Sequence, residues 1–176
     1  MPQSSTAALV TSLLATVPDF PSPGILFRDL TPVLADSAGF ASVIDNLGDA
    51  FAGCFDAVAG VEARGFLLAS AVAYRAGTGV LAVRKAGKLP GPVLREHYSL
   101  EYGDAALEVE PGHMPPGCRV LILDDVLATG GSINATGRLL RRSGCTIAGV
   151  GVVLELADLG GRSRLGELAL HSILSL

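Results

Sequence analysis

The sequence predicts an α/β fold in which a central, mainly parallel sheet is flanked by helices. Apolar segments of strand length alternate with segments of helical periodicity, in the order strand, helix, strand, helix. The expected strands are apolar throughout instead of alternating between apolar and polar residues. Strands of that kind are buried on both faces, as in a parallel sheet with helices on each side.

The elements follow in order from the N-terminus. Apolar residues from Leu9 to Val17 have the spacing of one helical face and Pro18 follows them, so the chain is expected to open with a helix. Residues 19–29 are too irregular for a helix or strand and too apolar for a solvated linker, which predicts an ordered loop. The remaining predicted elements are a helix over 40–51, a strand over 57–61, a helix over 65–76, strands over 80–83 and 120–123, a helix over 132–143 closed by Gly144, and a strand over 147–156.

Residues 85–116 interrupt this alternation with polar sequence that contains glycine and proline. Strand-like pieces occur within it over 93–102 and 106–109. So long an excursion inside a compact domain is usually functional, and we expect a lid. The chain of 176 residues shows no internal repeat or second boundary, so a single domain over 1–176 is predicted.

Composition excludes several classes of protein. The net charge of -4 gives no global basic field for binding nucleic acid or an anionic membrane. Apolar runs are far shorter than the roughly 20 residues of a membrane span, and no basic residue precedes the first apolar ones as in a secretory signal. Cys54, Cys118 and Cys145 are odd in number and lie in apolar sequence, which indicates reduced structural thiols. A cytoplasmic protein without nucleic-acid or membrane partners is expected.

The segment 120–132 carries the sharpest chemical signal. A buried-type strand leads into Asp124 and Asp125, and a turn with two glycines, Thr129–Ser132, then opens a helix. Backbone N–H groups of such a turn converge on a phosphate at the helix N-terminus, and the carboxylates suit ribose hydroxyls and a hydrated magnesium ion. The alternative is that Asp125 only begins a turn and that the glycines only allow tight packing.

Basic residues at two other places suggest a local anion site on this acidic chain. Arg64 follows a predicted strand and precedes a helix, where an α/β sheet places its ligands. Residues 84–95 contain Arg84, Lys85, Lys88 and Arg95 and no acid. The alternatives are a surface ion pair between Glu62 and Arg64 and a solvated basic face over 84–95.

Five blocks, 19–29, 60–66, 83–91, 98–103 and 120–132, resemble motifs of the type I phosphoribosyltransferase family and occur in its order. The wider chain is similar to the adenine phosphoribosyltransferases within that family. The resemblance spans nearly the whole chain. It implies a type I phosphoribosyltransferase-like fold with an N-terminal helix and a small hood over 1–34 and a flexible lid loop over 85–116.

The same resemblance implies an activity and its partners. The enzyme would transfer the 5-phosphoribosyl group from phosphoribosyl pyrophosphate to adenine, giving AMP and pyrophosphate in purine salvage. Mg²⁺ is the implied cofactor, and no direct metal ligand is assigned, although Asp124 and Asp125 could hold the ion through water. A homodimer is the expected assembly.

Residue roles are carried over from the matching motifs of the family. Binding of the ribose 5-phosphate is assigned to Asp124, Asp125, Ala128, Thr129, Gly130, Gly131 and Ser132. Pyrophosphate binding is assigned to Arg64, Arg84, Lys85 and Lys88, and Arg95 is left without a role. Adenine binding is assigned to Leu26, Phe27, Arg28 and Val126. The alternative for Leu26 and Phe27 is a plain core position.

Glu101 matches the family's candidate acid/base, which would take the N9 proton of adenine. From the residues alone, an exposed acid in a loop is the alternative. Two other functions compete with the expected one. A non-catalytic module that senses the same ligands would normally carry a DNA-binding domain, for which residues 1–18 are too few, and a six-oxopurine phosphoribosyltransferase would differ in its base.

Overall fold

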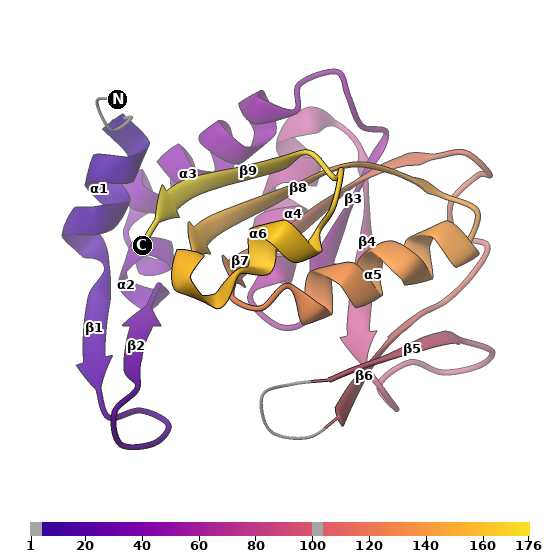
Figure 1. Ribbon diagram of the computed structural model, residues 1–176. Coiled ribbons are helices and arrows are strands. Elements are labelled where there is room, and N and C mark those ends of the chain that lie inside the picture. The colour runs from indigo at the N-terminus through magenta and orange to yellow at the C-terminus, as the bar shows by residue number, and fades with distance from the viewer. Residues whose placement is uncertain (1–4, 100–103) are drawn as a thin grey trace.

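The computed structural model describes residues 5–99 and 104–176 and confirms the α/β fold class. Among these residues a seven-stranded sheet has the order β5-β6-β4-β3-β7-β8-β9, and β1 and β2 form a separate two-stranded sheet. The pairs β4–β3, β3–β7, β7–β8 and β8–β9 are parallel, whereas β6 is antiparallel to both β4 and β5. Helices lie on both faces of the sheet (Figure 1).

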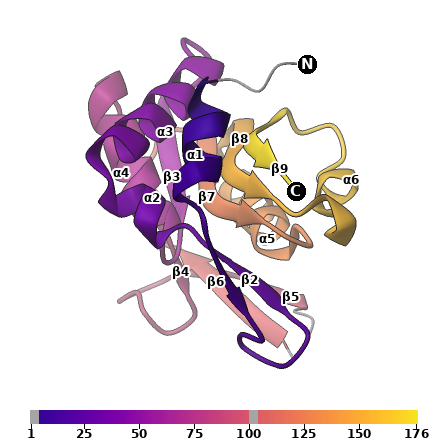
Figure 2. The ribbon, with the colours of Figure 1, turned by 90° about the vertical axis from the view of Figure 1, so that its left-hand side faces the viewer.

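The N-terminal segment differs from its prediction. Helix α1 (Ser5–Leu13) is shorter than expected, because Ala15–Pro18 forms strand β1 and pairs antiparallel with β2 (Leu26–Asp29). The expected loop over 19–29 therefore ends in a strand. Helical spacing over Leu9–Val17 could not exclude this, since the strand forms only through its partner. In Figure 1 the β1–β2 hairpin extends downward at the left of the main sheet, and in Figure 2 it lies in front of β5 and β6.

The following helices and strands agree with the sequence patterns, with small changes of their ends. After a short helix α2 (Thr31–Ala35), helix α3 (Ser37–Ala50) is capped by Asp36, whose carboxylate accepts a hydrogen bond from the Gly39 N–H at 2.7 Å. Strand β3 (Ala57–Val61) and helix α4 (Gly65–Ala76) have the expected bounds, and β4 spans Gly79–Lys85. The prediction of this βαβ unit is confirmed.

Strand β7 (Arg119–Leu127) is longer than the predicted 120–123 and includes both aspartates. The expected end of the strand before Asp124 was wrong because pairing with β8 continues through Leu127 and Glu155. Helix α5 (Gly131–Arg142) and strand β8 (Thr146–Glu155) follow. Asp124 and Asp125 thus point to opposite sides of a rigid, buried strand instead of standing in a turn.

Hydrophobic cores fill both faces of the sheet. One contains α1, α3 and α4 against alternate residues of β7 such as Leu121 and Leu123. The other contains α5 against the intervening residues, including Val120 and Ile122. Every residue of β3 is buried. The two-sided burial expected of the central strands is confirmed.

Two further regions complete the fold. Within the excursion over 85–116, β5 (Leu94–Ser99) and β6 (Asp104–Val109) pair antiparallel and extend the main sheet beyond β4 at its edge. Figure 1 shows this hairpin below the sheet, on the side away from β1 and β2. At the C-terminus, a 3₁₀ turn over Ala157–Leu159, a short helix α6 (Gly161–Arg164) and strand β9 (Leu170–Ser175) were not predicted.

Of the three cysteines, Cys118 and Cys145 are buried and free, as expected. Cys54 is exposed, which corrects the expectation of apolar surroundings, because the chain turns at the surface after α3. Within residues 5–99 and 104–176, no helix combines the length and apolarity that a bilayer span requires.

Candidate functional site

The site lies where the chain reverses its direction across the sheet. Strand β3 leads through α4 to β4 on one side, and its parallel neighbour β7 leads through α5 to β8 on the other. The carboxyl ends of β3 and β7 therefore meet at a topological switch point, where open α/β sheets bind ligands. Gly65 allows the start of α4 to approach β7, because a Cβ there would lie 2.7 Å from the Leu123 carbonyl oxygen.

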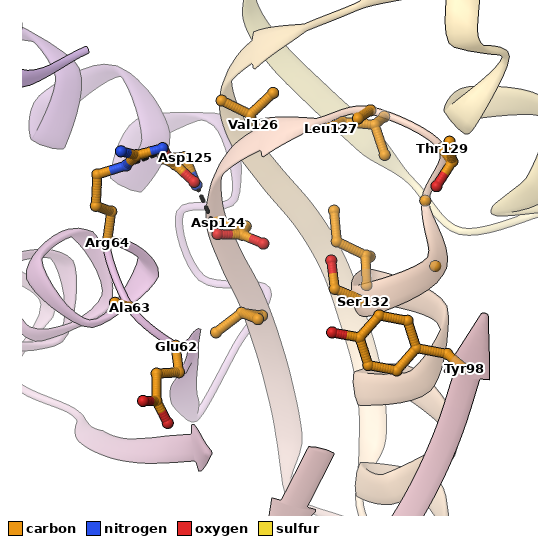
Figure 3. Close-up of a pocket in the computed structure, with 15 residues that line it drawn as sticks. Glu62, Ala63, Arg64, Tyr98, Asp124, Asp125, Val126, Leu127, Thr129 and Ser132 are labelled. Atoms are coloured by element: carbon orange, nitrogen blue, oxygen red, sulfur yellow. Dashed lines mark hydrogen bonds and ion pairs between the residues drawn. The ribbon is translucent and has the colours of Figure 1, made fainter. Parts of the chain in front are cut away.

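A cavity of about 410 Å³ opens at this point. Its walls come from the β3–α4 turn, the end of β7, the start of α5 and one residue of β5. The lining residues are Val61, Glu62, Ala63, Arg64, Tyr98, Asp124, Asp125, Val126, Leu127, Ala128, Thr129, Gly130, Gly131, Ser132 and Ile133. Figure 3 shows Arg64 and the two aspartates on one side of the cavity and Thr129, Ser132 and Tyr98 on the other.

Asp124 and Asp125 are both 8% exposed but have different partners. The Asp125 carboxylate accepts a hydrogen bond from Nε of Arg64 and forms an ion pair with it. Asp124 Oδ1 accepts the N–H of Asp125 at 2.9 Å. Burial, and next the charge of Asp125, raise the pKa of Asp124 well above its usual value. The site therefore holds one carboxylate in an ion pair with Arg64 beside a second carboxyl group that burial makes harder to ionise.

The turn between β7 and α5 forms the opposite wall. Gly130 has φ +80°, in the left-handed region, and a Cβ on it would lie 3.1 Å from the Gly161 carbonyl oxygen. From there α5 begins at Gly131, and its first residues, Gly131, Ser132 and Ile133, line the cavity, at the end of the helix where backbone N–H groups have no partner within the helix. The described structure therefore brings together the residues expected to bind the ribose 5-phosphate: Asp124, Asp125, Ala128, Thr129, Gly130, Gly131 and Ser132.

The basic residues assigned to pyrophosphate are only partly brought together. Arg64 lines the cavity, whereas Arg84, Lys85 and Lys88 do not belong to its lining. Glu62, which lines the cavity, holds Arg84 and Lys85 near it. Oε2 of Glu62 accepts hydrogen bonds from Nε of Arg84 at 3.1 Å and from the Lys85 backbone N–H at 2.8 Å. The alternative ion pair between Glu62 and Arg64 is wrong, since Arg64 pairs with Asp125.

Arg95, to which the sequence assigned no role, is half-exposed and its Nε donates to Glu108 at 2.8 Å. It lies on β5, apart from the cavity lining. The basic residues of 84–95 therefore do not form one solvated face, because Arg84 pairs with Glu62 and Arg95 pairs with Glu108.

The residues assigned to adenine are also divided. Val126 lines the cavity, but Leu26, Phe27 and Arg28 lie on β2, outside its lining. Phe27 contacts Phe20 edge to face with ring centroids 5.1 Å apart, and Leu26 is 50% exposed. Leu26 is therefore not a core residue, which corrects that alternative for it.

Glu101, the candidate acid/base, lies outside the described residues. Sequence reasoning assigned no role to several residues of the lining, namely Val61, Glu62, Ala63, Tyr98, Leu127 and Ile133. For Tyr98 the available signal was its place in an aromatic and acidic block within the excursion over 85–116. That block predicts function in general but not which side chain faces the cavity.

Mg²⁺ requires oxygen ligands and keeps several waters, so one or two carboxylates together with substrate phosphates are sufficient to hold it. Two adjacent buried carboxylates at the cavity wall fit this requirement. In the described part of the chain, no group of three or more His, Cys, Asp or Glu side chains is placed to hold a metal by itself. The residues fit an ion that arrives with a phosphorylated substrate.

Comparisons with known proteins agree with this geometry. Residues 29–167 match the model of the phosphoribosyl transferase domain. Adenine phosphoribosyltransferase of Clavibacter sepedonicus is 68% identical over 176 residues, covering 100% of this chain and 92% of that protein. The enzyme of that name from Mycobacterium tuberculosis is 56% identical over 170 residues, covering 96% of this chain and 80% of that protein.

Solved structures give the same result. The crystal structure of adenine phosphoribosyltransferase from Thermoanaerobacter pseudethanolicus has a TM-score of 0.92 at 40% identity and covers 97% of this chain and 99% of its own. The Saccharomyces cerevisiae enzyme, in complex with adenine and an imino-altritol bisphosphate, has a TM-score of 0.90 at 38% identity and the same coverage of both chains. The chain therefore belongs to the phosphoribosyltransferase family, among its adenine phosphoribosyltransferases.

Proposed function

We propose that this chain transfers the 5-phosphoribosyl group of phosphoribosyl pyrophosphate to adenine and releases AMP and pyrophosphate, as a purine-salvage enzyme. The observation that carries the proposal is one cavity, at the switch point of the sheet, that is lined by two buried carboxyl groups and by the first residues of helix α5. Carboxylates accept hydrogen bonds from ribose hydroxyls, and the helix N-terminus binds a phosphate. One cavity thus offers complementary groups to both parts of a phosphorylated ribose.

The ribose 5-phosphate is bound by Thr129, Gly130, Gly131 and Ser132 in this proposal, with Ala128 in the turn before them. Their N–H groups lie at the cavity wall, and the left-handed Gly130 lets the backbone turn tightly around the phosphate. Asp124 and Asp125 accept the ribose 2′- and 3′-hydroxyls. Their position on a buried strand fixes them before the substrate arrives, so little ordering is required on binding.

Pyrophosphate carries the negative charge that develops as its bond to the anomeric carbon breaks, and cations must stabilise it. Arg64 is the basic side chain in the cavity lining and is the first candidate. Arg84, Lys85 and Lys88 follow on β4 and the turn after it, and Glu62 joins Arg84 and the Lys85 backbone to the cavity wall. Magnesium, held through water by Asp124 and Asp125, supplies further charge neutralisation when it is bound.

Adenine is proposed to bind between Val126 and the hairpin that carries Leu26, Phe27 and Arg28. Exposed apolar groups on β2 suit the face of a purine ring, and Leu26 is 50% exposed. The Saccharomyces cerevisiae structure contains adenine, and the Giardia lamblia enzyme, 35% identical to this chain, contains 9-deazaadenine. Glu101 is proposed as the acid/base that takes the N9 proton of adenine.

A homodimer in the cytoplasm is proposed as the working form. Large apolar side chains are exposed on neighbouring elements of one side of the sheet, namely Leu67 at 53%, Tyr74 at 90% and Val80 at 48%. Leu67 and Tyr74 are seven positions apart on α4, so they share a helix face. A second copy of the chain would remove this apolar surface from water.

The test is to incubate the purified protein with phosphoribosyl pyrophosphate and magnesium, with adenine, hypoxanthine or guanine in separate reactions, and to quantify nucleotides by chromatography. AMP from adenine alone is the expected result. IMP or GMP as the main product would retain the fold and the transfer reaction but contradict the base assignment. No nucleotide, with phosphoribosyl pyrophosphate still bound, would indicate a sensing module.

A further inference from the structure

One face of strand β5 lies along helix α5, the helix that begins at the proposed phosphate site. Leu94 and Tyr98 pack against the core cluster that contains Ile133, Leu139 and Leu140 of α5. Residues 94, 96 and 98 alternate along the strand and share this face. The position of β5 is therefore coupled to α5 by side-chain packing.

Between Leu94 and Tyr98, a charged clamp fixes the register of the strand on the helix. Nε of Arg138 donates to Oε1 of Glu96 at 2.6 Å, and Nη1 of Arg142 donates to Oε2 of the same carboxylate at 2.9 Å. Nη1 of Arg142 also donates to the Arg95 carbonyl oxygen at 2.8 Å. The Glu96 side chain is only 20% exposed, and its hydrogen bonds to the two arginines lower its pKa. Both carboxylate oxygens are thus occupied by one helix.

Tyr98 lies two residues after Glu96 on β5, so the contacts of Glu96 with α5 also position Tyr98 at the cavity. It is the one residue of β5 in the described cavity lining, which also includes the helix N-terminus from Gly130 to Ile133. Figure 3 shows the Tyr98 ring beside Ser132, with its hydroxyl directed toward the interior of the cavity. Burial raises the pKa of Tyr98, so the hydroxyl remains a neutral hydrogen-bond donor at physiological pH.

We infer that Tyr98 is a phosphate-binding residue whose hydroxyl donates a hydrogen bond to the 5′-phosphate held at the start of α5, and that Glu96 is its positioning residue. The inference rests on the proposed function, because it needs a phosphorylated ribose in this cavity. It adds a donor from strand β5 to a site otherwise built from the turn between β7 and α5 and the start of α5. The Glu96–Arg138–Arg142 clamp acts through Tyr98 and does not touch the ligand.

The first test measures binding of AMP, adenosine and adenine to the wild-type protein and to Tyr98→Phe by calorimetry. A hydrogen bond to a charged group is strong, so Tyr98→Phe is expected to weaken AMP binding about tenfold or more. Adenosine and adenine lack the phosphate and should bind both proteins equally. Equal loss for AMP and adenosine would overturn the phosphate assignment in favour of a ribose contact, and unchanged AMP binding would overturn the inference altogether.

The second test addresses Glu96. Glu96→Gln, which keeps one acceptor but loses the charge, and Arg138→Met, which removes the partner from the helix, are each expected to raise KM for phosphoribosyl pyrophosphate several-fold. KM for adenine should not change. In the Tyr98→Phe background, Glu96→Gln should add little, because residues that act as a unit are not additive. Additive losses, or an equal fall in all kinetic parameters, would show a merely structural role.

Glu110→Gln is the matched control, because Glu110 pairs with His113 and is absent from both the cavity lining and the clamp. It removes the same charge and should leave both KM values unchanged. Wild-type protein that forms no AMP from adenine would reject the proposed function itself. Active wild-type protein with normal AMP binding by Tyr98→Phe would reject only the inference.

Discussion

Asp124 and Asp125 are adjacent on one strand, but their surroundings assign them different electrostatic roles. Asp125 is paired with Arg64, whereas burial, and next the charge of Asp125, raise the pKa of Asp124. Both residues belong to the buried strand β7, in the interior of the sheet. Preformed acceptors of this kind contribute to binding, whereas proton transfer needs a separate group, for which Glu101 is proposed.

This division of roles predicts different kinetic effects. Glu101→Ala should lower kcat by roughly 10²- to 10⁴-fold, the usual contribution of a general acid or base, and change AMP affinity little. Asp124→Ala combined with Asp125→Ala should weaken AMP binding by about tenfold or more, because hydrogen bonds to charged groups are lost. Steady-state kinetics and calorimetry measure both effects. Small, equal effects of the two changes on turnover would contradict these roles.

Gly130 predicts a second effect at the scale of one residue. Gly130→Ala should cost about 1–2 kcal/mol of stability, because an L residue is strained at φ +80°, and should also raise KM for phosphoribosyl pyrophosphate. Gly53→Ala is the control, since Gly53 has φ +74° with nothing within 4 Å of a Cβ. Denaturant unfolding should show a loss of stability for both variants, larger for Gly130→Ala because its Cβ would also lie 3.1 Å from the Gly161 carbonyl oxygen, with KM changed only for Gly130→Ala. A shift of KM in the control would refute a local role for Gly130.

Among the elements, helix α6 packs against the turn between β7 and α5. A Cβ on Gly161 would lie 2.2 Å from the Ala128 carbonyl oxygen, so the two segments are in close contact. Glu155, at the end of β8, holds α6 through Nε of Arg162 at 2.8 Å and accepts the Ser172 hydroxyl of β9 at 2.8 Å. The end of β8, helix α6 and strand β9 are thereby joined beside the site.

The Glu155–Arg162 pair predicts a pH dependence of stability. The hydrogen bond from Arg162 lowers the pKa of Glu155 below its ordinary 4.5, so its contribution is complete above that value and is lost as pH falls through the lowered pKa. Glu155→Gln should reduce stability at pH 7 by about 1–3 kcal/mol and have a smaller effect near pH 3.

Denaturant titrations of wild type and Glu155→Gln at several pH values between 7 and 3 measure this difference. Glu167→Gln is the control, because Glu167 is exposed and follows α6 closely in the sequence. It should leave the pH dependence of stability unchanged. A Glu155→Gln protein that loses stability with acid in parallel with wild type would contradict the role of this pair.

Considered as a whole molecule, the protein places its ligand site between two cores on opposite faces of one sheet. Helix α4 belongs to one core and α5 to the other, and both begin at the cavity. A ligand that contacts both helix starts therefore stabilises the whole domain. The N-terminal hairpin of β1 and β2 contributes no residue to the described cavity lining, and its part in adenine binding stays a prediction.

Ligand binding should accordingly raise the thermal stability. AMP at 100 times its Kd should add about 2.7 kcal/mol, which corresponds to an increase in Tm of roughly 5–10 °C for a domain of this size. Differential scanning fluorimetry measures the shift. Pyrophosphate alone should give a smaller increase than AMP, and an unchanged Tm with saturating AMP would contradict a shared site of α4 and α5.

The proposed homodimer gives a further prediction for the assembly. Gel filtration with light scattering should show a dimer at micromolar concentration, and Tyr74→Glu should dissociate it by placing a charge in the apolar surface. The control is Asp45→Glu on α3, which should leave the dimer intact because Asp45 is already acidic and exposed. A wild-type monomer would exclude the homodimer.

The order of amino acids is enough to predict the alternating elements and the motif over 120–132, because burial on two faces and helical periodicity are recorded in local residue patterns. The sequence also indicated that Arg64 follows the end of a strand, where an α/β sheet binds its ligands. Three contacts required the folded chain: Arg64 pairs with Asp125, 61 residues away, β1 pairs with β2, and Tyr98 lines the cavity. These contacts join segments distant in the chain, and packing of the sheet and helices, which no local pattern records, selects the partner of each side chain.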